Sequence, residues 1–162
     1  MSKKTIVLIA FFAILALVTI ITVLVYRRQH SDIMMELVLW SGDGGRRGHH
    51  IYYFIVDNDG ILTIYSGRSR VHRGNIRPGS NPLIPILRSR TRITLNEENF
   101  QQISELVDAI VAGDTGRRGA STNVLAVFSR NGNIYYNSTY WTEPIMDLIL
   151  MLIELTPFTI RW

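Results

Sequence analysis

The feature that most constrains this chain is an apolar run near its N-terminus. Residues Thr5 to Tyr26 include no charged side chain. A helix of that length extends roughly 33 Å, which matches a hydrocarbon layer of about 30 Å. Basic residues precede and follow the run. The pattern predicts a transmembrane anchor at residues 5–26, between a short basic tail at residues 1–4 and a juxtamembrane linker at residues 27–33.

Two other interpretations of the run are weaker. A cleaved signal peptide has an apolar stretch of about 7 to 15 residues followed by a small-x-small cleavage site, and Val25-Tyr26-Arg27 is no such site. A buried core helix is disfavoured because no face of this helix would be polar. The sequence therefore predicts a single-pass protein of the cell membrane, here taken to be bacterial.

The side of the membrane is a more open question. A strict count of Lys and Arg near the two ends of the run leans slightly toward a cytoplasmic domain. A four-residue tail with two lysines and an amine is nevertheless costly to translocate, which favours an extracytoplasmic domain. The chain has no cysteine, so disulfides, cysteine zinc sites, a thiol nucleophile and lipidation at cysteine are excluded.

An internal repeat is the strongest signal in the remaining chain. The segment Gly42–Gly48 recurs as Gly113–Gly119 with six of seven residues identical, and the similarity continues through a following turn glycine, Gly60 in the first copy and Gly132 in the second. Such self-similarity indicates a repeated structural unit. Each copy continues with a hairpin and then a helix, so the sequence predicts a duplicated ββα unit.

The elements of this domain follow from periodicity and turn residues. Asn96 is a candidate helix N-cap, Gly113 ends that helix, and Pro144 lies in the first turn of a second one. The predicted strands are Glu36–Trp40, Ile51–Val56, Ile61–Tyr65, Val124–Phe128 and Ile134–Tyr136, and the tail Phe158–Trp162 is a candidate for an additional edge strand.

The predicted fold class is α+β: residues 34–162 form one antiparallel sheet of about five strands with two helices on one face. Residues 67–92 are expected to form a long Arg-rich loop, because they contain Pro78, Pro82 and Pro85. A loop of this length in a small domain is usually functional or disordered.

The sequence contains no complete catalytic or metal-binding motif among those considered below. Asp57-Asn58-Asp59-Gly60 lacks the outer ligands of a calcium loop, and no phosphate-binding or nucleophile-elbow motif is present. His49 and His50 are adjacent, so a strand would direct them to opposite faces. We therefore expect no catalytic residues, no metal and no cofactor, although an enzyme whose residues are dispersed in the sequence stays open.

Arginine is the remaining candidate for function. The segment from Gly60 to Asn96 has no acidic residue, and arginine forks match phosphate and carboxylate oxygens in two-point contacts. If the repeat is symmetrical, the two Gly-Arg-Arg-Gly loops could converge on one anion. The candidate anion-binding residues are Arg46, Arg47, Arg117, Arg118, Arg68, Arg70, Arg73, Arg77, Arg88, Arg90 and Arg92. The bland alternative is that these arginines are solvated charges on loops.

The sequence thus predicts a membrane-anchored, non-catalytic binding or scaffolding domain. Its expected partners are the bilayer, through residues 5–26, and an anionic polymer, an anionic lipid or an envelope protein, through the arginines. Nucleic acid is disfavoured because no aromatic RNA-binding motif or recognition helix is present. The alternatives are a membrane-tethered enzyme and a domain that docks on anionic headgroups. No known family is recognised.

Overall fold

A strand of mostly apolar residues, β1 (Ile33–Ser41), lies inside the sheet and is buried on both of its faces. The computed structural model describes residue 12 and residues 14–20, 33–41, 49–69, 87–116 and 119–160. The chain divides into two units, Met1–Asp32 and Ile33–Trp162. The second unit contains the sheet and the two helices described below.

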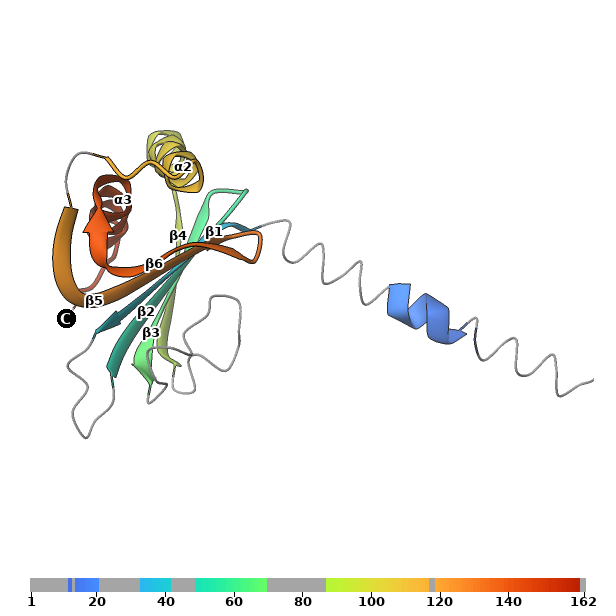
Figure 1. The fold of residues 1–162 in the computed structure, drawn as a ribbon. Coiled ribbons are helices and arrows are strands. Elements are labelled where there is room, and N and C mark those ends of the chain that lie inside the picture. Colours follow the sequence, from blue (N-terminus) through green and yellow to red (C-terminus); the bar gives the residue numbers. More distant parts are fainter. Residues whose placement is uncertain are drawn as a thin grey trace, which may run out of the picture. The chain divides into compact units, whose positions relative to one another are not determined.

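The sheet has six strands in the described residues, and every neighbouring pair is antiparallel. The spatial order is β4-β3-β2-β1-β5-β6 (Figure 1). One hairpin thus lies on each side of β1. The other strands are β2 (His49–Asp57), β3 (Ile61–Ser69), β4 (Leu87–Thr94), β5 (Gly119–Arg130) and β6 (Asn133–Thr142).

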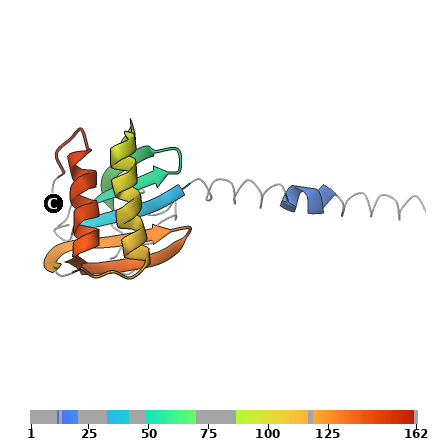
Figure 2. The same cartoon turned by 90° about the horizontal axis from the view of Figure 1, so that it is seen from above.

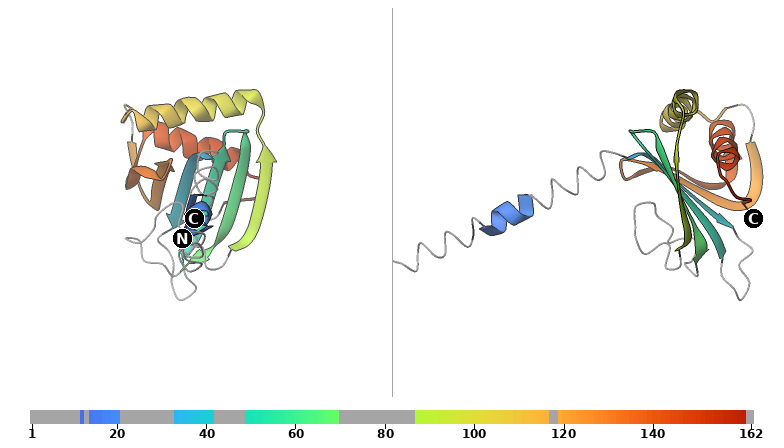
Figure 3. Two further views of the ribbon diagram at one scale, coloured as in Figure 1. Left: turned by 90° about the vertical axis from the view of Figure 1, so that its right-hand side faces the viewer. Right: turned by 180° about the vertical axis from the view of Figure 1, so that it is seen from behind.

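Two helices, α2 (Glu97–Val111) and α3 (Glu143–Glu154), lie side by side and antiparallel over one face of the sheet (Figures 2 and 3). The main core lies between this helical layer and the sheet. One row of cross-strand partners runs across all six strands on that face. It consists of Thr91, Ile64, Phe54, Leu37, Phe128 and Tyr136.

The opposite face of the sheet carries a smaller apolar cluster. Because side chains alternate along a strand, Leu37 and Leu39 face the helices whereas Val38 and Trp40 face away from them. We call this side the second face. Its buried members are Val38, Trp40, Ile51, Leu125 and Val127, with the half-buried Tyr53 packed against them.

The helix and turn signals of the sequence have clear structural counterparts. Asn96 caps α2, since its side-chain oxygen accepts a hydrogen bond from the Asn99 N–H at 2.8 Å. Gly60 and Gly132 turn the two hairpins with φ of 74° and 78°, a conformation that glycine adopts without strain. The second hairpin, β5–β6, is followed directly by α3, whereas β4 stands between the first hairpin and α2, so the prediction of two ββα units is wrong for the first copy.

We expect the replacement Asn96→Ala to lower the free energy of unfolding by about 1 kcal/mol, because α2 would lose its side-chain cap. The matched control is Thr142→Ala. Thr142 occupies the same position before α3 but makes no side-chain cap hydrogen bond, so its replacement should change stability by less than about 0.5 kcal/mol. Urea denaturation followed by circular dichroism measures both values. Equal losses for the two variants would contradict this assignment.

Several predictions about the sheet are wrong. The described residues form six strands rather than about five, and both ends of the loop predicted at residues 67–92 belong to strands. Strand β3 continues to Ser69, and β4 begins at Leu87 and pairs with β3. The tail is not a strand over residues 158–160; instead Ile160 packs into the core. The last two residues lie outside the described residues.

The predicted membrane anchor is also contradicted. Among the residues that the structure describes, no helix is both long enough and apolar enough to cross a bilayer. Within the predicted span the structure describes residue 12 and residues 14–20, which are helical. The rest of residues 5–26 lies outside the described residues. The predictions of a single-pass topology and a cell-membrane localisation are corrected accordingly.

Candidate functional site

The described part of the predicted arginine set lies on two neighbouring strands, β3 and the edge strand β4. Arg68 lies near the end of β3, and Arg90 and Arg92 lie on β4. Arg88 is also on β4, but only its backbone is described. The remaining candidates, and with them the predicted convergence of the two Gly-Arg-Arg-Gly loops, lie outside the described residues. They are Arg46, Arg47, Arg70, Arg73, Arg77, Arg117 and Arg118.

Two of these arginines form a pair on the second face of the edge strand. Arg90 is opposite Tyr65 of β3, and Arg92 is opposite Thr63. Residues two apart on a strand point to the same face and are separated by about 7 Å. Both side chains are exposed. The pair therefore presents two guanidinium groups at the spacing of alternate residues in an extended chain.

A series of contacts connects Arg90 to the middle of the sheet. Its guanidinium lies 5.5 Å from the centroid of the Tyr65 ring, a cation–π distance. The Tyr65 ring stacks on Tyr53 at 6.0 Å, and the Tyr53 hydroxyl donates a hydrogen bond to Oε1 of Glu36. Ser129 Oγ donates to the other Glu36 oxygen at 3.0 Å. These contacts span five strands and restrict where the Arg90 side chain lies.

Arg68 and the two histidines make contacts that are separate from the contacts of Arg90 described above. Arg68 Nη2 lies 3.4 Å from Nε2 of His50, its cross-strand partner on the helical face. His49 lies on the second face, where its ring contacts Trp40 at 4.0 Å and its Nδ1 lies 3.1 Å from the Ser41 carbonyl oxygen. The histidines thus point to opposite faces. Within the described residues, no cluster of three metal-ligating side chains exists.

The helical layer has the opposite charge. Helices α2 and α3 contain no Lys, Arg or His. Arg130 of β5 forms an ion pair with Asp108 at 2.6 Å, which neutralises one of the carboxylates. The acidic residues of the two helices are Glu97, Glu98, Glu105, Asp108, Glu143, Asp147 and Glu154. The domain is therefore electrically two-sided, with a basic sheet edge and an acidic helical layer.

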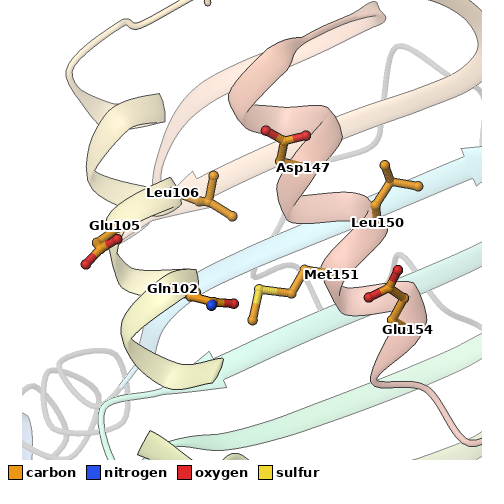
Figure 4. Close-up of a pocket in the computed structure, with 7 residues that line it drawn as sticks. All are labelled: Gln102, Glu105, Leu106, Asp147, Leu150, Met151 and Glu154. Carbon is orange, nitrogen blue, oxygen red and sulfur yellow. The ribbon is translucent and has the colours of Figure 1, made fainter. Parts of the chain in front are cut away.

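A groove of about 490 Å³ lies between the two helices on this acidic layer. Figure 4 shows Leu106 of α2 and Met151 of α3 directed into the space between the helices, with Asp147 and Glu154 further along α3. The lining residues are Gln102, Glu105, Leu106, Asp147, Leu150, Met151 and Glu154.

Sequence reasoning missed this groove. A usable signal was present, because no basic residue occurs in residues 93–116 or 131–160, which contain both helices. The pairing of α2 with α3 is a tertiary property that periodicity does not reveal. No protein-family model, curated protein or solved structure matches the chain, so the function has to be inferred from the geometry itself.

Proposed function

We propose that residues 33–162 form a non-catalytic binding domain that holds an extended, acidic segment of a partner protein along β4. The observation that carries this proposal is the position of Arg90 and Arg92 on an edge strand. Among the described residues β4 pairs with β3 alone. An edge strand with open backbone donors and acceptors is a template for a further strand.

The side chains of β4 provide the specificity that backbone pairing lacks. An added strand would place alternate residues beside Arg90 and Arg92, on the second face. Carboxylates at those alternate positions would each meet a guanidinium, whose fork matches two carboxylate oxygens. The cation–π contact with Tyr65, at 5.5 Å from the ring centroid, orders the Arg90 side chain before binding. This order reduces the side-chain entropy lost on binding.

Charge also disfavours wrong associations along this edge. The guanidinium groups repel a second copy of β4, which is one way in which proteins prevent sheets from joining edge to edge. An acidic strand removes this repulsion, whereas a neutral or basic strand does not. The same two arginine charges thus attract an acidic partner and oppose the self-association of β4.

The test is binding of a fluorescent peptide of alternating Glu and Val to the full chain, measured by anisotropy. We expect Arg90→Gln combined with Arg92→Gln to weaken binding about tenfold, which corresponds to a loss of about 1.4 kcal/mol. The effect should shrink at high salt because these arginines are exposed. Arg130→Gln is the control, since Arg130 pairs with Asp108 away from β4.

Strand addition is separated from simple charge attraction by a second peptide. The same sequence with every backbone nitrogen methylated keeps every carboxylate but has no N–H donor on either edge of the strand. It should bind at least tenfold more weakly than the unmodified peptide. The proposal fails if both peptides bind equally, or if Arg130→Gln reduces binding as much as the double variant on β4. Equal binding of an unstructured polyphosphate would also reject it, in favour of an anionic polymer.

A further inference from the structure

We propose a second binding surface: the groove between α2 and α3 docks a basic amphipathic helix of another protein. This surface is separate from β4, lies on the opposite side of the sheet, and does not depend on the function proposed above. The occupant is specified by the two properties of the groove, an apolar floor and an acidic rim.

The apolar floor of the groove consists of Leu106 and Met151, which pack against the edge of the main core between the helices, and of Leu150, which lies outside that core. Leu106 and Met151 are only half-buried, and Leu150 is 51% exposed. The buried face of α3 is instead formed by Ile145, Leu148, Ile149 and Leu152. Leu150 therefore contributes little to the free energy of folding. Covering its side chain with another apolar surface would be favourable.

The rim determines the charge of the occupant. Glu105, Asp147 and Glu154 line the groove together with one neutral polar residue, Gln102, and no cation is among the lining residues. Basic residues are absent from both helices. Lysine or arginine side chains flanking an apolar strip would be attracted to this field, whereas an acidic or purely apolar segment would not.

The shape of the groove suits a helix. Its residues recur on α3 at Asp147, Leu150, Met151 and Glu154, which is the spacing of one helical stripe. The two helices run antiparallel side by side (Figure 4). A third helix can lie in a groove between two helices and insert apolar residues at positions i, i+3 or i+4, and i+7. The volume of about 490 Å³ accommodates several such side chains.

The test uses a labelled helical peptide of about 18 residues with leucine on one face and lysine on the other. Its binding to the full chain is measured by anisotropy. The Leu150→Lys variant should bind at least tenfold more weakly, because it removes an apolar contact and adds repulsion. Ile134→Lys is the matched control. Ile134 is 45% exposed and lies on β6, outside the groove, so its replacement should change affinity less than twofold.

Two further measurements address charge. Glu105→Gln combined with Glu154→Gln should weaken binding about fivefold at low salt and less than twofold at 1 M salt, where the Debye length is about 3 Å. A peptide with glutamate in place of lysine should not bind measurably. The proposal is overturned if Leu150→Lys and Ile134→Lys have equal effects, or if the glutamate peptide binds as tightly as the lysine peptide. Retained folding of each variant is checked by circular dichroism.

Discussion

Replacement of Phe54 by alanine is expected to lower the free energy of unfolding by about 3 to 5 kcal/mol. Phe54 has no exposed surface, and its cross-strand partners are Leu37 of β1 and Ile64 of β3. It lies under the helical layer in the main core. Removing its ring therefore loses transfer free energy and leaves a cavity that strands paired on both sides can close only in part.

Urea denaturation followed by circular dichroism gives the result for Phe54→Ala. A loss of this size is a large share of the 5 to 15 kcal/mol that is typical of a domain, so part of the population should be unfolded on mild heating. Ile134→Ala is the control, because Ile134 is 45% exposed on β6, and it should lose less than about 1 kcal/mol. A loss below about 1.5 kcal/mol at Phe54, with an unchanged denaturant slope, would contradict the assigned core.

The α+β class and the helices were accessible from the sequence because their signals are local. Asn96 caps one helix, Pro144 lies in the first turn of the other, and apolar residues recur at helical spacing after these markers. The hairpins were likewise indicated by turn residues that tolerate positive φ, as at Gly60 and Asn131. In each case a few neighbouring residues determine the backbone.

Strand β4 was missed for a physical reason. Its sequence alternates arginine with serine, threonine and isoleucine, so the period of two is present in charge rather than in hydrophobicity. An edge strand needs only one neighbour and can remain polar. Because Pro78, Pro82 and Pro85 lie just before it, the sequence predicts a loop over the whole stretch. The apolar run at residues 5–26 has the opposite effect: its hydropathy predicts an element, a bilayer-spanning helix, that is not found among the described residues.

The candidate site was only half accessible from the sequence. Composition identified Arg90 and Arg92 as members of an acid-free stretch, but it did not place them on a free edge. The contacts of Arg90 with Tyr65, and of Tyr53 with Glu36, join residues from four strands. Their proximity follows from sheet order, which non-local pairing determines.

Glu36 provides the second large expected effect. Its side chain is only 6% exposed, and its two oxygens accept hydrogen bonds from Tyr53 and from Ser129, the latter at 3.0 Å. Replacement by leucine keeps the apolar bulk but leaves two hydroxyl groups without their acceptor. A buried polar group that loses its partner costs about 1 to 3 kcal/mol, so Glu36→Leu should lower the free energy of unfolding by about 2 to 4 kcal/mol, as measured by urea denaturation.

Removing the hydroxyl groups as well should restore much of that loss. The triple variant Glu36→Leu, Tyr53→Phe and Ser129→Ala has no polar group left in this network, and replacing all partners by apolar groups of similar shape can be nearly neutral. We therefore expect the triple variant to be at least about 1 kcal/mol more stable than the sum of the single effects predicts. Strict additivity would show that Glu36 does not act through these two hydroxyls. The Tyr53→Phe replacement keeps an aromatic ring at the position that stacks on Tyr65. Binding of the acidic peptide through Arg90 should therefore persist in the triple variant. This result would separate the stability of the network from the recognition at β4.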